Sequence, residues 1–341
     1  MACEAALWHE SIPGAKAAVG NVRSKIIGDC TVIVQRLPRF VPRALLSLHR
    51  EIAPHSIETS SRNGERTEPV STASVGGITI GFEDEGSGEP LVLVHGHPFD
   101  RSMWQPQIEH FRRAGWRVIA PDLRGYGEST VVPGTTTLET FVRDIAALLD
   151  HLGVDRFVLG GLSMGGQIVM EFHRLFPGRI RGLVLADTFA AAETEAGKAG
   201  RYMMAERLLR EGMSGYAEEV LPKMVAPSNI EALPDVAQHV LLMMTGTSPQ
   251  GAAAALRGRA ERPDYVDMLP RIAVPTLVVV GADDEFTPVS DARLIHERVP
   301  DATLEIIDEA AHMPNLERAA EFNAALQHFL DSLPTAARTE R

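Results

Sequence analysis

The sequence predicts an α/β fold in which a mostly parallel sheet carries helices on both faces and a helical insertion interrupts the series. From Val75 onward, short apolar segments typical of buried strands alternate with amphipathic segments typical of helices. The chain has 341 residues, of which 45% are hydrophobic, and this is enough apolar material for a large core. Between residues 188 and 271 the alternation stops, and this stretch is typical of several helices without a strand.

Each expected strand is either a short apolar run or an alternating segment bounded by turn residues. Thr136 and Glu139 are spaced as a capping box at the start of one helix, and Gly153 is placed to end that helix. The expected strands are residues 77–83, 91–94, 117–120, 156–160, 182–186, 276–280 and 303–307. The expected helices include residues 138–152, 163–176 and 315–333.

The segment at residues 188–271 is rich in methionine. An all-helical insertion in a strand–helix series is a natural lid over the sheet edge, and methionine suits an apolar wall that repacks around ligands. We therefore expect an apolar pocket ceiling, although core packing is the better explanation of any single methionine. Seven of the twelve methionines lie here: Met203, Met204, Met213, Met224, Met243, Met244 and Met268.

Composition and charge exclude several classes of function. The net charge of −12 opposes binding to phosphate backbones, so we expect no nucleic-acid partner. No apolar run approaches the roughly 20 residues that span a bilayer. Both cysteines, Cys3 and Cys30, lie near the N-terminus, which excludes a disulfide framework or a Cys nucleophile elsewhere. This cysteine usage fits a reducing compartment, and we expect a cytoplasmic protein.

The N-terminal segment differs from the rest of the chain. The first 70 residues hold 9 Lys/Arg against 7 Asp/Glu, whereas the remainder is strongly acidic. We expect residues 1–74 to be a poorly ordered extension that ends in a Ser/Thr/Glu-rich linker at 59–74. The expected domain then covers residues 75–333, and residues 334–341 form a C-terminal tail.

The sharpest chemical signal is Gly161-Leu162-Ser163-Met164-Gly165, between an expected strand and an expected helix. This is the context that a G-x-S-x-G nucleophile elbow requires. The turn is so tight that the flanking positions need glycine, and the serine is held in a strained conformation with its hydroxyl projecting. The helix that follows adds backbone N–H groups and a positive dipole end. We therefore expect Ser163 to be a catalytic nucleophile.

A serine nucleophile needs a base, and the base needs an acid that orients it. His312 is the expected base, because it lies in a loop directly after a strand and follows the serine in the chain. Four later histidines fall within expected helices, namely His173, His239, His296 and His328. The residues alone leave the acid open: Asp283, Asp284 and Glu285 follow one strand, and Asp187 ends the preceding strand.

The loop His95-Gly96-His97-Pro98 follows another strand. Acyl transfer needs two N–H donors aimed at the developing oxyanion. We expect the backbone amides of His97 and Met164 to supply them, with Gly96 allowing a close backbone approach. A metal site is the other interpretation of His95 and His97, with Asp100 nearby. Nothing in the sequence completes such a ligand set, so we expect no metal and no cofactor.

Five motifs, in the family order and spacing, resemble the α/β-hydrolase superfamily over about residues 75–333. They are His95-Gly-His-Pro98, Pro121-Asp-Leu-Arg-Gly-Tyr-Gly-Glu-Ser129, Gly161-Leu-Ser-Met-Gly-Gly166, Gly281-Ala-Asp-Asp-Glu-Phe-Thr-Pro288 and Ala311-His-Met-Pro-Asn315. The resemblance implies an eight-stranded, mostly parallel sheet. It implies Asp284 as the acid, because this aspartate stands three residues after the glycine and four before the proline. It also implies His312 as the base.

Within the superfamily the chain is similar to 3-oxoadipate enol-lactonases and bacterial carboxylesterases. This resemblance implies a serine hydrolase that cleaves a small ester or lactone through an acyl-enzyme. A histidine at position 97 departs from the family pattern, and its side chain has no assigned role. Trp8, Trp104 and Trp116 all lie outside the helical insertion, which disfavours a carbon–carbon bond hydrolase. A cofactor-free haloperoxidase or perhydrolase and a slow small-molecule receptor remain alternatives, and the oligomeric state is open.

Overall fold

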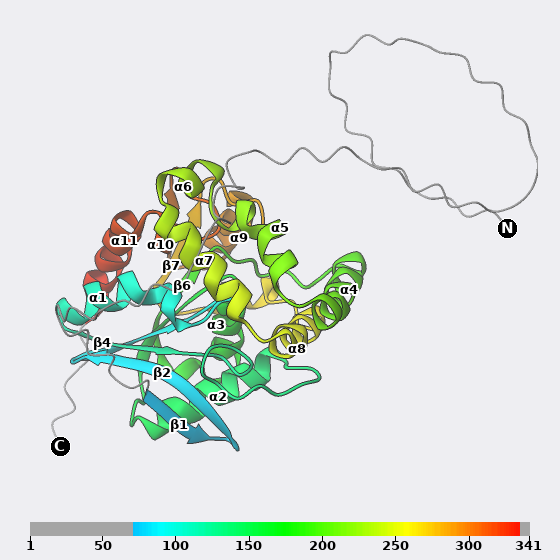
Figure 1. Ribbon diagram of the computed structural model, residues 1–341. Helices are drawn as coiled ribbons and strands as arrows, with labels where there is room; N and C mark the ends of the chain where they lie inside the picture. The colour runs from blue at the N-terminus through cyan, green and yellow to red at the C-terminus, as the bar shows by residue number, and fades with distance from the viewer. Residues whose placement is uncertain (1–70, 335–341) are drawn as a thin grey trace, which may run out of the picture. The chain divides into compact units, whose positions relative to one another are not determined.

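The computed structural model describes residues 71–334, and these residues form an eight-stranded sheet with helices packed on it (Figure 1). The strand order is β1-β2-β4-β3-β5-β6-β7-β8, and the predicted α/β fold class is confirmed. The strands are β1 (Ser71–Val75), β2 (Ile78–Gly86), β3 (Glu89–Val94), β4 (Trp116–Pro121), β5 (Phe157–Leu162), β6 (Ile180–Ala186), β7 (Thr276–Gly281) and β8 (Ala302–Ile307).

The six strands from β4 to β8 in this order pair in parallel, whereas β1 and β2 form an antiparallel edge. Parallel strands covered on both faces read as continuous apolar runs, which is why β3, β5 and β7 were visible in the sequence. The chain leaves β3 toward β4 on one side and returns to β5 on the other. Loops after β3 and β5 therefore diverge at the carboxyl edge, where ligands bind in such sheets.

Helices cover the two faces of the sheet in separate sets. One core cluster joins β-strand residues such as Val92 to helices α2, α3 and α9, and the other joins neighbours such as Leu91 to α1 and α11. This in–out alternation is the two-residue period of a strand. The helices are α1 (Gln105–Arg113), α2 (Leu138–His151), α3 (Met164–Leu175), α9 (Val289–Arg298), α10 (Pro314–Glu317) and α11 (Ala319–Ser332). Short 3-10 helices occur at η2 (Arg101–Trp104) and η3 (Pro177–Arg179).

Strand β1 corrects the expected linker. Residues 71–74 belong to the sheet, because β1 pairs with β2 along its whole length. Ala73 and Val75 are buried against Leu148 of α2, so these two side chains hold the strand in place. Two apolar positions in a five-residue segment are too few to distinguish a strand from a polar linker. The expected extension before residue 71 and the tail after residue 334 lie outside the described residues.

Two helix boundaries also differ from the sequence prediction. Helix α2 is capped by Thr137, whose hydroxyl oxygen accepts the amide of Thr140 at 3.1 Å, and not by Thr136. Thr136 is buried instead, and its own amide donates to the carbonyl of Ala254. The expected closing helix is interrupted at Arg318, whose backbone is not helical (φ −133°, ψ 54°), so α10 and α11 are separate helices. Gly153 ends α2 with a φ of 67°, as predicted.

The insertion between β6 and β7 is helical, and no strand occurs in it. It comprises α4 (Glu195–Glu211), α5 (Ser214–Met224), α6 (Pro227–Ala232), α7 (Pro234–Gly246), α8 (Pro249–Ala260) and the 3-10 helix η4 (Val266–Arg271). The expected methionine ceiling is wrong. Of the seven methionines only Met224 lines the cavity described below, and Met203 is 68% exposed. The buried ones pack among the helices and the sheet.

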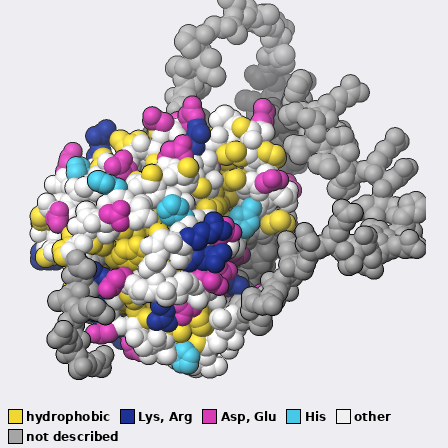
Figure 2. Space-filling view, turned by 90° about the vertical axis from the view of Figure 1, so that its left-hand side faces the viewer, with side chains coloured by type: hydrophobic (Ala, Val, Ile, Leu, Met, Phe, Trp, Pro, Cys, Tyr) yellow, Lys and Arg dark blue, Asp and Glu magenta, His cyan; other side chains and the backbone are white. Residues whose placement is uncertain are grey.

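Across residues 71–334 no helix is both long and apolar enough to span a bilayer. On the face shown in Figure 2, acidic and basic side chains are interspersed with apolar ones, and no broad basic patch is visible.

The position of β1 generates a prediction about truncation. A chain lacking residues 1–65 keeps β1, whereas a chain lacking residues 1–77 loses it. We expect the first deletion to leave turnover and melting temperature unchanged. The second should lower the melting temperature by roughly 5 °C, because burial of a valine side chain stabilises by about 1.5–3 kcal/mol. Thermal unfolding followed by circular dichroism measures both, and equal melting temperatures for the two deletions would contradict the role of β1.

Candidate active site

Ser163 occupies a strained turn between β5 and α3. Its φ of 58° and ψ of −117° lie in a region that side-chain-bearing residues rarely adopt. A Cβ added to Gly161 would lie 2.4 Å from the backbone of Gly165, so the motif glycine is required by this close approach. The amide of Ser163 donates to the carbonyl of Ala186 at 2.9 Å, and its carbonyl accepts the hydroxyl of Thr188 at 2.8 Å. These bonds to the neighbouring strand and its following loop hold the turn.

His312 pairs with Asp284 at the same edge of the sheet. The Nδ1–H of His312 donates to the Asp284 carboxylate over 2.8 Å, and both side chains are buried. The other carboxylate oxygen of Asp284 accepts the amides of Phe286 at 2.8 Å and Thr287 at 3.2 Å, and the Thr287 hydroxyl also donates to this carboxylate. Burial alone would raise the pKa of Asp284, but His312 and these donors outweigh it and lower the pKa. Asp284 is therefore ionised at neutral pH.

The structure separates the competing carboxylates. Asp283 and Glu285 are exposed, and Glu285 pairs with Lys223 at 3.3 Å, so neither contacts His312. The other histidines after Ser163 lie within α3, α7, α9 and α11, as expected. Of the candidates weighed from the sequence, Asp284 and His312 are brought together, and Asp187 lies beside them.

Asp187 is a buried carboxyl group with no ionic partner. One of its oxygens accepts the amide of Gly281 at 2.9 Å, and the other has no hydrogen-bond partner among residues 71–334. Burial raises the pKa of Asp187 well above its usual range, and the negative charge of Asp284 raises it further. Asp187 therefore holds its proton more tightly than Asp284 does, which leaves Asp284 as the charged partner of His312.

The loop after β3 lies against the nucleophile elbow. A Cβ added to Gly96 would lie 3.2 Å from the Cβ of Ser163, so the loop backbone passes directly beside the serine. The amides of His97 and Met164 donate to no other group among the described residues, as a pair of free oxyanion donors requires.

The side chain of His97 points to Tyr126, with 2.7 Å between Nδ1 and the phenol oxygen. Burial lowers the pKa of His97 well below its ordinary value, and the nearby Arg259 and Arg201 lower it further. His97 is therefore a neutral imidazole. Its Nε2 atom is buried and has no partner within residues 71–334.

His95 uses both ring nitrogens inside the protein. The amide of Leu123 donates to Nε2 at 2.9 Å, so Nδ1 carries the hydrogen and donates to the carbonyl of Gly96 at 2.8 Å. Asp100 caps the 3-10 helix η2 by accepting the amide of Ser102. Within residues 71–334, one group of three potential metal ligands is close enough to share an ion, and it consists of Asp187, Asp284 and His312. Neither His95 nor His97 belongs to it, which counts against the alternative metal site.

Ser163 and His312 open into one cavity of about 130 Å³. Their side chains share no direct hydrogen bond in the described part of the chain, and such contacts commonly tighten only when substrate binds. Residues from the insertion also line this cavity. Its lining consists of His97, Ser163, Phe189, Arg201, Tyr216, Met224, Leu256, Arg259, Phe286, Thr287 and His312.

Apart from Met224, sequence reasoning missed the cavity residues contributed by the insertion. Arg201 and Arg259 lie in α4 and α8, where charged residues at helical spacing usually indicate a solvated face. The one signal in the sequence is that six alanines and glycines precede Arg259 in α8, which is typical of a buried helix, and α8 is buried along most of its length.

Comparison with known proteins agrees with the fold and the site. The model of the alpha/beta hydrolase fold family matches residues 89–319, and the chain belongs to this family. It is a hydrolytic enzyme of the α/β-hydrolase type. It is 33% identical over 253 residues to 3-oxoadipate enol-lactonase 2 from Acinetobacter baylyi, covering 73% of this chain and 92% of the relative.

Two further relatives show the range of the family around this chain. An esterase from Thermogutta terrifontis, solved with malate bound, is 40% identical with a TM-score of 0.74, covering 77% of this chain and 97% of the esterase. A non-heme haloperoxidase from Rhodococcus erythropolis is 30% identical over 276 residues, covering 77% of this chain and all of the relative.

The raised pKa of Asp187 generates a prediction about stability and pH. The folded protein holds the Asp187 proton that the unfolded chain releases near pH 4, so the stability from this group falls as pH rises toward the raised pKa. Asp187→Asn keeps the shape and cannot ionise. The difference in unfolding free energy, wild type minus variant, should therefore fall as the pH rises above about 4. Urea unfolding at several pH values measures it, and a difference independent of pH would contradict a raised pKa.

Proposed function

We propose that the protein is a serine hydrolase that cleaves a small carboxylic ester or lactone through an acyl-enzyme intermediate. The observation that carries this proposal is the common cavity of Ser163 and His312, with His312 held by the ionised Asp284. A nucleophile, a base and an orienting acid in the chain order Ser, Asp, His are the parts that acyl transfer requires.

In the first step the hydroxyl of Ser163 attacks the carbonyl carbon and gives its proton to His312. The Nδ1–H of His312 is committed to Asp284, so the free Nε2 is the atom that accepts the proton. Ionised Asp284 stabilises the imidazolium that forms. The amides of His97 and Met164 donate to the oxyanion, and the N-terminus of α3 adds a positive dipole end.

Collapse of the tetrahedral intermediate expels the alcohol or enol oxygen, which takes the proton from His312. With a lactone substrate the leaving oxygen stays attached to the acyl chain. A water molecule then attacks the acyl-enzyme while His312 accepts its proton, and Ser163 is released. The steps balance without any cofactor or metal.

The cavity supports a small substrate. Its volume of about 130 Å³ is below the roughly 300–1,000 Å³ of sites for drug-sized ligands. We propose that the helical insertion acts as a lid, because its residues line the cavity opposite Ser163. The relatives named an enol-lactonase and an esterase support this choice of substrate class. The described insertion contains no tryptophan, so the carbon–carbon hydrolase stays the weaker alternative.

Removal of the nucleophile tests the proposal. Ser163→Ala should lower kcat for p-nitrophenyl acetate by about 10⁶-fold, since the remaining rate comes from binding and the oxyanion donors. It should also abolish covalent labelling by an organophosphonate. Ser102→Ala serves as a control, because Ser102 lies outside the cavity. Labelling of Ser163→Ala at the wild-type rate would refute the assignment of the nucleophile.

The assignment of the acid has a matched test in two adjacent residues. Asp284→Asn should lower kcat by about 10⁴-fold, because the amide no longer stabilises the imidazolium or fixes its tautomer. Asp283→Asn should leave kcat within about twofold, since Asp283 is exposed and has no contact with His312. Steady-state kinetics on both variants decide between them, and a large loss in Asp283→Asn with little in Asp284→Asn would reverse the assignment.

A further inference from the structure

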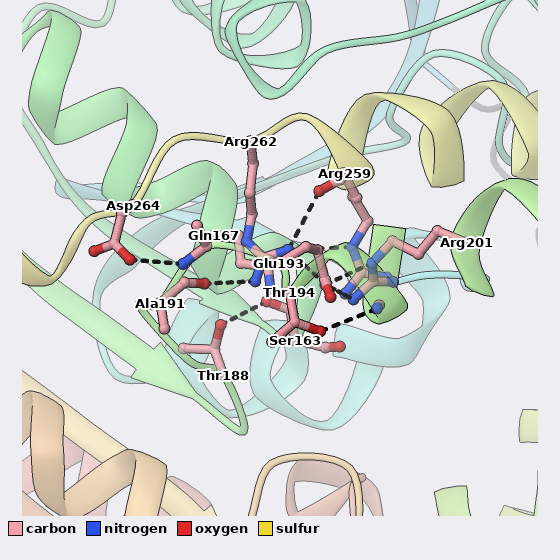
Figure 3. Close-up of polar contacts among 12 residues, drawn as sticks. Ser163, Gln167, Thr188, Ala191, Glu193, Thr194, Arg201, Arg259, Arg262 and Asp264 are labelled. Atoms are coloured by element: carbon pink, nitrogen blue, oxygen red, sulfur yellow. Dashed lines mark hydrogen bonds and ion pairs between the residues drawn. The ribbon is translucent and has the colours of Figure 1, made fainter. Parts of the chain in front are cut away.

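Three arginines gather around a single carboxylate in the wall of the cavity. Arg201 comes from α4, Arg259 from α8 and Arg262 from the segment after α8, and Figure 3 shows their side chains converging near Glu193, with Ser163 close by. Glu193 is the only carboxylate in residues 71–334 that pairs with any of the three. The group therefore carries a surplus of two positive charges beside the reacting serine.

Two of the arginines are accounted for by protein partners. Arg262 donates to Glu193 at 2.7 Å and to the carbonyl of Ala191 at 2.6 Å, and it stacks over Phe189 with 4.5 Å between guanidinium carbon and ring centroid. Arg201 donates to the same Glu193 carboxylate at 2.6 Å through Nε. Arg262 therefore connects the loop before α4 to the segment after α8, whereas Arg201 connects this loop to α4 and also lines the cavity.

Arg259 is different, because it is buried and has no anionic partner. Only 7% of its surface is exposed, and its single side-chain hydrogen bond in the described part of the chain is from Nε to the amide oxygen of Gln167 at 3.2 Å. Burial lowers the pKa of Arg259 well below its ordinary value, and Arg201 and Arg262 lower it further. The terminal nitrogens of this guanidinium have no counter-charge in the described part of the chain. Because a buried charge without a partner is costly, an anion bound there would be stabilising.

The cavity itself is where that counter-charge fits. Arg259, Arg201 and His97 line it together with Ser163 and His312. The buried Nε2 of His97 is a second polar atom in this wall with no protein partner. A guanidinium binds a carboxylate through two parallel N–H donors, which neutral ester groups cannot match.

We propose that Arg259, assisted by Arg201, binds a carboxylate group of the substrate, so that the enzyme prefers esters or lactones that carry a free carboxylate on the acyl chain. This inference rests on the proposed function and narrows its substrate class. The carboxylate neutralises part of the surplus charge, and the carbonyl to be cleaved is held at Ser163 within the same small cavity. Binding energy from this end of the substrate positions the reacting end.

A matched pair of substrates tests the preference. Monomethyl glutarate and methyl 4-carbamoylbutanoate have the same shape and differ in one charge. We expect the wild-type enzyme to favour the anionic ester in kcat/KM. Arg259→Met should remove this preference. We expect kcat/KM for the anionic ester to fall by about 10- to 100-fold, mainly through a higher KM, whereas kcat/KM for the amide-bearing ester should change little. Arg259→Lys should restore part of it. Arg257→Met is the control, because Arg257 in the same helix pairs with Glu206 at 2.7 Å outside the cavity.

Binding of glutarate separates this inference from the proposed function. Calorimetry should detect glutarate binding to the wild-type protein and to Ser163→Ala, and its loss in Arg259→Met. If neither ester is cleaved while glutarate still binds through Arg259, the hydrolase proposal fails and the anion site stands. Equal cleavage of both esters by the wild-type enzyme, no glutarate binding, or an equal loss on both esters in Arg259→Met would overturn the carboxylate site.

Discussion

The strained turn at Ser163 is the constraint on which the rest of the site depends. A side-chain-bearing residue in this conformation costs about 1–3 kcal/mol, and it persists only where its surroundings over-determine it. Here β5, β6 and α3 do so, through the bonds of Ser163 to Ala186 and Thr188 and the close packing of Gly161 on Gly165. The same turn lies against the loop after β3, where a Cβ added to Gly96 would be 3.2 Å from the Cβ of Ser163.

Charge in the site is divided between two sides of the cavity. On the sheet side, Asp187 and Asp284 are neighbouring carboxyls whose pKa values are shifted in opposite directions, which favours the negative charge on Asp284, beside His312. On the insertion side, Arg201 and Arg262 share Glu193, and Arg259 has no anionic partner in the described part of the chain. Arg201 and Arg259 thus line the cavity that Ser163 also lines, and our proposal of a carboxylate site rests on this arrangement.

The sequence predicted the parts of this molecule that local chemistry determines. The strands between β3 and β8 are buried on both faces and read as apolar runs, and the serine turn needs glycines at fixed positions. Strand β1 was missed because only Ala73 and Val75 mark its buried face. The choice of Asp284 over Asp283 followed from resemblance and not from the residues. The two aspartates are adjacent and chemically identical, and only the fold buries Asp284 beside His312 while Asp283 is exposed.

Tertiary packing decided what the sequence could not show. Thr136 and Thr137 are equally good caps by type, and burial of Thr136 against α8 selects its neighbour. The methionines of the insertion pack mostly in its core, while Arg201 and Arg259 reach the cavity from helices that read as ordinary surface. No periodicity distinguishes an arginine that faces solvent from one that faces a cavity until the helices are placed.

The central claim is that Ser163 carries the acyl group during turnover. Mixing excess enzyme with monomethyl glutarate, quenching in acid within the first turnover and mapping the digested protein by mass spectrometry tests it directly. If Ser163 is the nucleophile, we expect one glutaryl group on the peptide that contains Ser163, and we expect it to disappear as free glutarate forms. Methanol release without an acylated peptide, or acylation of a different residue at the same rate, would contradict it.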